Sequence, residues 1–564
     1  MDDFQDAYAP LSRRTVIARM GWGSAAILAS MSPVGAQDEA SRAARNTGSG
    51  DDDALLARIL SGPEPFIPSR EQPYRITRTL PIEGSRTVLL EPGTRIVWAG
   101  PSQDGGRPIA VFQAMGDDVA LAAAGDGEAF VECEAPRPFV YAAAMSGRRG
   151  FSVRGIHARN CQHVHVDSSV AEYEAVRTGE ADRNIARDVL ISGGGARFQS
   201  PPDEGYGACL LAYVAGARVR DVCYENVSHG IQWWGGDSGL HPWQNGARAN
   251  ERKCSGLLIE RALVKNAQAG GVWGSMGRDV MVRDCQVQDC LDVGFDAEGC
   301  VDTVFERCTA GNSRNGCFAT FFLNDRIRFV DCRGTVENKA WPLFRTYNVT
   351  QSNADNRDIA VEGGFFECLD PTGPGTMDCG SGPVRELAIT GASLTNVCID
   401  TFFVNMHRTR IADNQLTFSE PLPSVPAIRV GGSQGLPGAR GEAIVAGNRI
   451  RYTVPPAAAE AAGDPVAIAI VENDYNASAT SRVTGNEVSG PFAVGIALVN
   501  ASGNAGIIPA FEIAGNRFED LARSARLLSV GREGQASAPA IRWDAAQTSN
   551  GRAIGLDRAL GGPG

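Results

Sequence analysis

The chain has 564 residues, of which 43% are hydrophobic, and it carries a formal net charge of -12 at pH 7. A chain of this length can bury a large core, and its 66 glycines favour a turn-rich protein made of several domains or of one long repeat array. The acidity argues against nucleic acid and against an anionic membrane surface as main partners, because neither attracts a negatively charged protein.

The first 36 residues have the layout of an export signal. Arg13 and Arg14 precede a short apolar segment with several glycines and alanines, and Val34 and Ala36 are small residues before a cleavage point. A chance arginine pair ahead of an apolar helix is the alternative. The layout predicts a twin-arginine-type signal over residues 1–36, and hence a soluble periplasmic or secreted protein that begins near Gln37. No later run reaches the roughly 20 apolar residues of a membrane span.

Three further segments follow from composition. Residues 37–53 are small and polar, and a flexible leader is predicted over residues 37–59. Residues 531–564 are predicted to form a loose C-terminal tail. Residues 60–530 are predicted to form the folded body. The body begins with residues 74–100, in which a strand and an apolar run precede a Pro-Gly turn.

Two histidines lie close together early in the body. In Gln162-His163-Val164-His165, strand alternation places both imidazoles on one face, which allows a two-ligand metal site. Histidines that are exposed or hydrogen-bonded are the more common arrangement.

A long loop, residues 235–253, interrupts the pattern further on. It holds Asp237, Trp243 and Arg248, and long loops on a rigid scaffold often carry function. An ordinary solvated connection is the alternative interpretation.

The middle of the chain repeats about every 23 residues, a period typical of solenoids. Alternating β-branched and aromatic residues predict strands in each copy. The aligned copies are residues 256–277, 278–300, 301–324 and 325–348. A turn column holds residues that tolerate a left-handed backbone, namely Asn226, Asn266, Asp289, Asn312 and Asn338, and weaker late copies place Asn414, Asn448, Asn486 and Asn516 at the turn. Each copy therefore consists of short strands and turns, and neighbouring copies are predicted to pair in parallel.

This organisation resembles the right-handed parallel β-helix of the pectate-lyase-like superfamily over roughly residues 60 to 530. The predicted fold class is all-β, a single-domain right-handed parallel β-helix (solenoid) with a capped N-terminal end. Tandem β-sandwiches are the competing fold, but they need hairpin turns at closer spacing. The family within the superfamily is not identified, because the Asn-Thr-Asp strand of polygalacturonases, the calcium cluster of pectate lyases and the Asp-Pro-His-Glu run of mannuronan epimerases are not found.

Two carboxylates, Asp296 and Glu298, lie two residues apart in the strand VGFDAEGC, residues 293–300. Side chains at i and i+2 of a strand share a face, about 7 Å apart along the backbone. Alignment on the glycines of neighbouring copies predicts that both acids face outward between exposed aromatic residues. The predicted substrate-binding residues around them are Gln232, Trp234, Trp273, Phe318, Phe321 and Arg345, with Trp243 and Arg248 from the loop. Solvated surface acids without a role are the alternative.

The 14 cysteines include a column, Cys285, Cys308 and Cys332, at inward positions of successive copies. Disulfides between coils are allowed in an exported protein, but we expect these thiols to pack as a buried ladder of small apolar groups. The cysteines are not in the C-x-x-C pairs that structural zinc favours. No metal and no cofactor is predicted.

Three functions fit these patterns. The first is an exported, glycoside hydrolase-like enzyme that cleaves a glycosidic bond of a polysaccharide or oligosaccharide. Asp296 and Glu298 would be the acid and its nucleophile or base, and Asp237 a third acid. The second is a polysaccharide lyase acting by β-elimination, in which Arg345, Arg248 and Arg252 hold an acidic substrate and a lysine, arginine, tyrosine or histidine acts as the base. The third is a non-catalytic glycan-binding surface protein. A carbohydrate is the expected partner in each case, and a homo-oligomer is left open, because β-helices have side faces that can trimerise.

Overall fold

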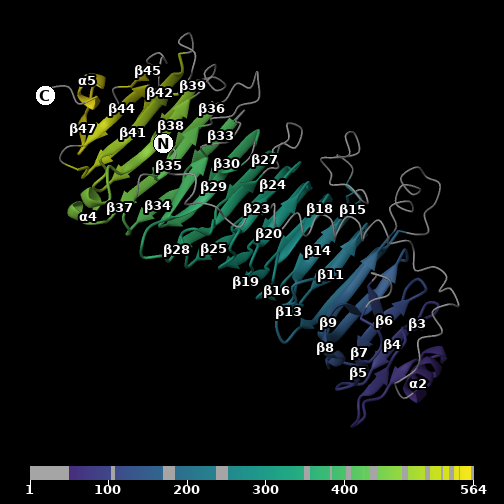
Figure 1. The fold of residues 1–564 in the computed structure, drawn as a ribbon. Helices are drawn as coiled ribbons and strands as arrows, with labels where there is room; N and C mark the ends of the chain where they lie inside the picture. Colours follow the sequence, from purple (N-terminus) through teal and green to yellow (C-terminus); the bar gives the residue numbers. More distant parts are fainter. Residues whose placement is uncertain are drawn as a thin grey trace. The chain divides into compact units, whose positions relative to one another are not determined.

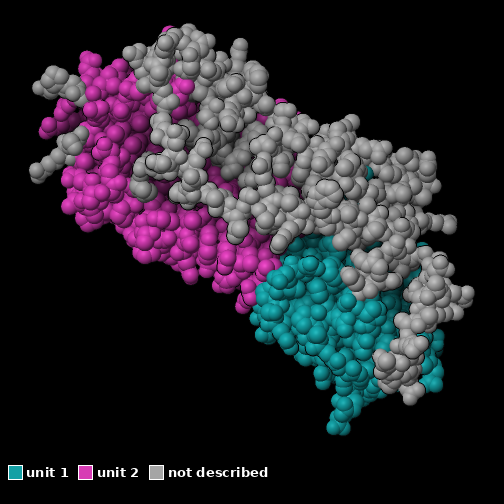
Figure 2. Space-filling view, viewed as in Figure 1, with its two compact units in different colours: residues 1–258, 275–278 teal, residues 259–274, 279–564 magenta. Residues whose placement is uncertain are grey.

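The structure, a computed structural model, describes residues 50–102, 108–168, 185–236, 252–347, 356–381, 384–401, 408–422, 425–431, 442–472, 480–501, 508–522, 525–532, 539–544 and 547–560. The chain divides into two compact units, which Figure 2 shows in different colours. Unit 1 comprises residues 1–258 and 275–278, and unit 2 comprises residues 259–274 and 279–564. The export signal predicted over residues 1–36 lies outside the described residues.

Unit 1 begins with a helix, and short strands follow one another after it. Its elements are α2 (Gly50–Ser61), β1 (Phe66–Ile67), β2 (Tyr74–Ile76), β3 (Leu80–Ile82), β4 (Thr87–Leu90), β5 (Arg95–Trp98), β6 (Ile109–Ala114), β7 (Ala120–Ala123), β8 (Ala129–Ser146), β9 (Ser152–Asp167), β10 (Arg187–Arg197), β11 (Gly207–Ala212), β12 (Ala215–Arg220), β13 (Cys223–Glu225) and β14 (His229–Trp234). The entry segment 74–100 thus contains the four strands β2 to β5.

Several strands follow β14 near the change of unit and in the first coils of unit 2. They are β15 (Cys254–Glu260), β16 (Leu263–Lys265), β17 (Val272–Ser275), β18 (Gly277–Arg283), β19 (Gln286–Gln288), β20 (Val293–Glu298), β21 (Val301–Glu306), β22 (Thr309–Gly311), β23 (Gly316–Thr320), β24 (Asp325–Val330), β25 (Arg333–Val336), β26 (Phe344–Tyr347), β27 (Arg357–Glu362), β28 (Phe365–Cys368), β29 (Gly375–Ser381), β30 (Glu386–Thr390), β31 (Ser393–Thr395) and β32 (Val397–Thr401).

Unit 2 continues with the same kind of element to the end of the described chain. These elements are β33 (Arg408–Ala412), β34 (Gln415–Phe418), β35 (Ile428–Gly431), β36 (Glu442–Ala446), β37 (Arg449–Tyr452), α4 (Pro456–Ala461), β38 (Val466–Glu472), β39 (Thr480–Thr484), β40 (Glu487–Ser489), β41 (Val494–Asn500), β42 (Ala510–Ala514), β43 (Arg517–Glu519), β44 (Arg526–Arg532), β45 (Ala540–Trp543), β46 (Thr548–Ser549), β47 (Arg552–Ala553) and α5 (Leu556–Ala559). Strands are therefore also described beyond residue 530.

Each strand pairs with the strand one coil later, and the pairing is parallel. In unit 2, β20 pairs with β23, β23 with β26 and β26 with β29. By contrast, β46 and β47 pair in antiparallel fashion. Figure 1 shows these strands side by side within each unit. The described chain is thus almost all strand in a parallel β-helix, which confirms the predicted fold class.

Equivalent residues of successive coils stack inside unit 2. Thr303 pairs with Ile327 and Phe305 with Phe329, as the repeat alignment predicted, and the two phenylalanine rings stack at 4.9 Å. The predicted thiol ladder is also confirmed as buried, since Cys285, Cys308 and Cys332 are each 0% exposed. Apolar columns of this kind supply the hydrophobic burial that holds the coils together.

The predicted turn column has the expected backbone at four of its five positions. The φ angles are 54° at Asn226, 51° at Asn266, 59° at Asp289 and 50° at Asn312. Asparagine and aspartate adopt this left-handed conformation at low cost, because their short polar side chains bond locally. Asn338 is not among the residues with positive φ.

A second asparagine column lies inside the late coils of unit 2. Asn414, Asn448, Asn486 and Asn516 are at most 1% exposed. The Asn486 Nδ2 group donates to the Val445 carbonyl and to Asn516 Oδ1, both at 2.9 Å, and Asn486 Oδ1 accepts from the backbone and the side chain of Asn448 at 3.0 Å. An amide side chain is both donor and acceptor, so identical residues can satisfy one another along the column.

No helix in the described part of the chain is long and apolar enough to cross a membrane. The described helices α2, α4 and α5 have 12, 6 and 4 residues.

The buried asparagine column generates a stability prediction. Replacing Asn486 with alanine removes four side-chain hydrogen bonds and leaves buried partners unsatisfied, so we expect the free energy of unfolding to fall by about 3 kcal/mol. Asn338→Ala is the matched control. Asn338 is exposed and its Oδ1 accepts one bond, from the Ala340 backbone, so its loss should cost less than about 0.5 kcal/mol. Urea unfolding measures both, and equal costs would contradict the role given to the column.

Candidate functional site

The predicted acid pair lies on β20 in unit 2. Phe295 and Ala297 point into the core and are 0% exposed, and the Phe295 ring stacks on Phe318 at 5.3 Å with an interplanar angle of 9°. Strand alternation then places Asp296 and Glu298 together on the opposite face. Gly294 precedes them because a Cβ there would lie 2.7 Å from the Cys317 carbonyl oxygen.

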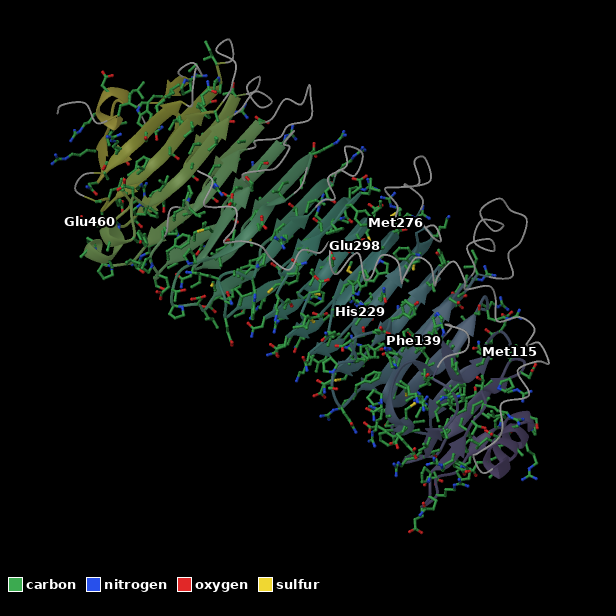
Figure 3. The ribbon with its side chains drawn as sticks, viewed as in Figure 1. Met115, Phe139, His229, Met276, Glu298 and Glu460 are labelled. Atoms are coloured by element: carbon green, nitrogen blue, oxygen red, sulfur yellow. The ribbon has the colours of Figure 1, made fainter. Side chains whose placement is uncertain are left out.

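The two acids differ in exposure. Asp296 is only 2% exposed, whereas Glu298, at the end of β20, is half-buried and is labelled in Figure 3. The expectation of two solvent-exposed acids is therefore wrong for Asp296. A buried carboxylate is far more sensitive to its surroundings than a solvated one, because the low dielectric strengthens every nearby electrostatic interaction.

The predicted register between β20 and β23 is wrong by one residue. The sequence alignment matched Gly294 with Gly316 and so put Phe318 beside Asp296 on the outer face. In the structure Val293 pairs with Gly316 and Asp296 pairs with Ala319. Phe318 is 0% exposed and packs in the core, because burying its ring is worth about 2 kcal/mol more than burying the alanine that follows it.

Other predicted sugar-binding aromatics are also covered. In unit 2, Phe321 is 2% exposed and its ring meets Phe322 edge-on at 5.3 Å, whereas Trp273 is half-buried. In unit 1, Trp234 is 7% exposed and its Nε1 donates to Tyr213 Oη at 3.0 Å. The expectation that Trp234, Phe318 and Phe321 are exposed is therefore wrong.

Gln232 of unit 1 has a structural contact that the sequence did not indicate. Its side chain is 6% exposed, and Oε1 accepts a hydrogen bond from the Gly207 backbone at 2.9 Å. This bond fixes the segment that leads into β11.

Asp296 belongs to a column of outward residues in unit 2, which we call the outward ladder. Backbone pairing runs from Asp296 to Ala319, and then to Arg345 and onward. The Gly271 backbone donates to the Val293 carbonyl, which places Trp273 beside Asp296 on the other side. The ladder comprises Trp273, Asp296, Ala319, Arg345, Asp378, Asp400 and Arg429.

Ion pairs neutralise the charges at the far end of this ladder. Arg345 Nε lies 3.1 Å from Asp378 Oδ2, and Arg429 Nε donates to Asp400 Oδ1 at 2.9 Å. Arg345 also donates to Asn315 Oδ1. Asp378 and Asp400 are thus adjacent acids with one arginine on each outer side. Asp296 differs from them, because its neighbours in register are Trp273 and Ala319.

The two histidines of unit 1 have different surroundings. His163 is 0% exposed and its Nδ1 lies 3.0 Å from Tyr224 Oη, and burial lowers the pKa of His163 to about 3. His165 is 8% exposed, and its ring centroid lies 5.1 Å from that of Tyr141. His165 Nε2 is 3.9 Å from Asp167 Oδ2. The two imidazoles therefore do not share one set of partners.

Several predicted residues cannot be placed. Asp237, Trp243 and Arg248 of the loop lie outside the described residues. Among the residues that the structure does describe, no group of three or more histidine, cysteine or acidic side chains could hold a metal ion.

Sequence reasoning missed most of the polar residues of the outward ladder. Asp378, Asp400 and Arg429 lie in coils that are separated by insertions, so the 23-residue frame does not reach them. A local signal could have revealed two of these residues. The strand VCIDT contains Asp400 and the strand IRVG contains Arg429, and in each strand a single charged residue lies among β-branched residues. Tyr141 and Tyr206 of unit 1 are buried polar residues that sequence reasoning also missed, and the sequence around them shows no comparable pattern.

Comparison with known proteins finds no matching family model and no matching curated protein. Solved structures do match. The A-module of the mannuronan C-5 epimerase AlgE6 from Azotobacter vinelandii is 12% identical with a TM-score of 0.36, covering 83% of this chain and 91% of its own. A family 28 exopolygalacturonase of Yersinia enterocolitica is 12% identical with a TM-score of 0.44, covering 64% and 75%. The catalytic unit of a GH87 α-1,3-glucanase from Streptomyces thermodiastaticus is 12% identical with a TM-score of 0.31, covering 83% and 63%.

With TM-scores below 0.5, these structures carry no argument about this chain, and its parallel β-helix is established by its own strand pairing. At 12% identity no residue role and no substrate is transferred from them.

Burial of His163 generates a pH prediction. Its pKa is about 3 in the folded protein and about 6.5 in an unfolded chain, so below pH 6.5 only the unfolded state takes up this proton. Stability is therefore lost as the pH falls from 6.5 toward 3, with a slope of at most about 1.4 kcal/mol per pH unit from this group. We expect His163→Gln to reduce the slope of unfolding free energy between pH 5.5 and 4.5 by about that amount.

Urea unfolding at several pH values measures the slopes of the wild type and the variant. His157→Gln is the control, because His157 is only partly buried and should contribute a smaller slope. Equal slopes in wild type and His163→Gln would contradict the prediction.

Proposed function

We propose that the protein is an exported carbohydrate-active enzyme that cleaves a glycosidic bond at β20. One observation carries the proposal. Asp296 and Glu298 share the outward face of one strand, and the residues beside Asp296 in register are a tryptophan and an alanine. Paired carboxyls in such a setting suit proton transfer to a leaving oxygen.

The different burial of the two acids suggests how they divide the work. Asp296 is the better candidate for the general acid, because burial disfavours the charged carboxylate and so favours the protonated form. Glu298 is the more exposed, and it is the candidate nucleophile or base. Because Asp296 is only 2% exposed, catalysis requires movement of the residues that cover it when substrate enters.

A half-buried tryptophan beside the acids supports a sugar as substrate. Trp273 precedes Asp296 in the outward ladder, and an indole ring can stack on the apolar C–H face of a sugar ring. The lyase alternative is less favoured, because Arg345, its proposed carboxylate-binding residue, already contacts Asp378 and Asn315. Asp237, Trp243 and Arg248 stay predicted site residues, and export through the signal over residues 1–36 is part of the proposal.

The test is a release assay with neutral and acidic polysaccharides. We expect the wild type to release new reducing ends and the Asp296→Asn/Glu298→Gln variant to be slower by about 1,000-fold, because each acid–base group contributes about 100- to 10,000-fold. The matched control is Asp302→Asn/Glu306→Gln, which removes the same charges from β21, where both acids make surface ion pairs. It should keep full activity.

The other outcomes separate the alternatives. An unsaturated product that absorbs ultraviolet light would identify a lyase. Full activity in the Asp296→Asn/Glu298→Gln variant would contradict the site. Glycan binding without cleavage in both proteins would indicate a non-catalytic binding protein.

A further inference from the structure

Unit 1 contains a buried cluster of polar and aromatic side chains that the proposed reaction does not use. We call Tyr141, Gln162, His165 and Tyr206 the Tyr–His cluster. Each is at most 8% exposed. Tyr141 and Tyr206 pack together with Leu210, and the rings of Tyr141 and His165 lie 5.1 Å apart. The cluster comes from β8, β9 and the residue that precedes β11.

Three side-chain atoms of the cluster are buried without a hydrogen-bond partner among the described residues. They are Gln162 Oε1, His165 Nε2 and Tyr206 Oη. Buried polar atoms in native proteins are nearly always paired with protein groups, water or a ligand. Three such atoms in one cluster point to a polar ligand, which can reach them only when the side chains that cover them move apart, because none of the three is accessible to solvent in this structure.

The Gln162 amide is oriented by the backbone around it. Its Nε2 donates to the Pro138 carbonyl at 3.3 Å and to the Tyr206 carbonyl at 3.2 Å. A flipped amide would place Oε1 against those two carbonyl oxygens, so Oε1 must be the atom that is left over. Gly205 allows this close approach, because its φ is 131° and a Cβ there would lie 3.2 Å from Gln162 Nε2.

The segment that carries Tyr206 is also held in place. Tyr141 Oη donates to the Gly207 carbonyl at 3.1 Å, and the Gly207 amide donates to Gln232 Oε1 at 2.9 Å. The unpartnered atoms therefore lie on a fixed framework, and a preorganised framework lowers the entropic cost of binding.

The chemistry of the three atoms selects the ligand. Gln162 Oε1 only accepts hydrogen bonds, whereas Tyr206 Oη and the imidazole of His165 can each donate or accept. Burial lowers the pKa of His165, so its ring is neutral at neutral pH, and the Asp167 carboxylate lies 3.9 Å from Nε2. An acceptor and a carboxylate together repel an anion, while a hydroxyl group can both donate and accept.

An aromatic ring beside the cluster completes this match. Phe139 is partly buried, and its ring meets that of Tyr206 edge-on at 6.0 Å; Figure 3 labels it on the ribbon. The apolar C–H face of a sugar packs well on such a ring. We propose that unit 1 binds a neutral sugar residue through its hydroxyl groups at the Tyr–His cluster. Binding there does not require bond cleavage at Asp296.

The test is calorimetric titration of the full chain with neutral tetrasaccharides and with uronates. The probes are cellotetraose, maltotetraose, xylotetraose, mannotetraose and laminaritetraose, compared with tetragalacturonate and tetramannuronate. Titrations use the Asp296→Asn/Glu298→Gln background, so that no cleavage heat is recorded. We expect at least one neutral probe to bind, and both uronates to bind at least about tenfold more weakly.

Tyr206→Phe tests whether the cluster is the binding site. We expect it to weaken binding of the neutral probe about tenfold, the effect of losing one hydrogen bond to the ligand. Its melting temperature should stay the same or rise, because the variant removes a buried hydroxyl without a partner. Tyr452→Phe is the control. Tyr452 Oη accepts a bond from the Leu422 backbone at 3.1 Å in unit 2, so its loss should lower the melting temperature and leave binding unchanged.

Three results would overturn the proposal. They are no binding of any probe, binding that is equally strong in Tyr206→Phe, and uronates that bind as tightly as the neutral probes. The first, together with a higher melting temperature for Tyr206→Phe, would mean that the three atoms bind ordered water alone. Failure of the release assay would leave this result unaffected, because binding is measured without cleavage.

Discussion

Parallel backbone pairing between successive coils determines which side chains of the repeat become neighbours. It sets equivalent residues of neighbouring coils about 4.8 Å apart, so that each position of the repeat becomes a column of side chains. A column is stable only when its members tolerate close copies of themselves. Phenylalanine rings stack, as Phe305 and Phe329 do, and buried asparagines donate to and accept from one another, as Asn448 and Asn486 do.

Charged residues cannot repeat in this way, because like charges at one strand spacing repel each other strongly when partly buried. In the outward ladder of unit 2, ion pairs offset this electrostatic repulsion. Asp378 and Asp400 are neighbours, but Arg345 and Arg429 flank them and form ion pairs with them. In the same ladder, the residues beside Asp296 in register are Trp273 and Ala319.

Much of the fold could be predicted because the repeat expresses it many times. Three features recur from copy to copy: the period-two alternation, the left-handed turn residues and the thiol column. A misleading residue in one copy therefore does not change the predicted fold. The register beside the acid pair was not predictable in the same way. It depended on whether Gly316 pairs with Val293 or with Gly294, and the sequence pattern allows both. Burial of Phe318 decides between them, and burial is a property of the packed coil.

The candidate site was predictable in part. Asp296 and Glu298 stand out in the sequence because two acids interrupt an apolar strand, and the structure does place them on one face. The solvent exposure of Asp296 and Glu298 was not predictable, because the residues that pack over an outward strand face are distant in sequence. The same holds for Tyr141, Gln162 and Tyr206, which are 21 and 44 positions apart by their numbers and meet only in the coil.

Local signals in the chain are enough to predict the repeating strand and turn unit, the parallel pairing of its copies and the presence of an acid pair on one strand. These features depend on local conformational preference and on the spacing of apolar residues, which a linear chain displays directly. Packing between coils decides which outward side chains are buried, which charges pair across coils and which polar atoms lack a partner among the described residues. Those properties arise from contacts between residues of different coils, and insertions of varied length between the coils conceal such contacts in the sequence.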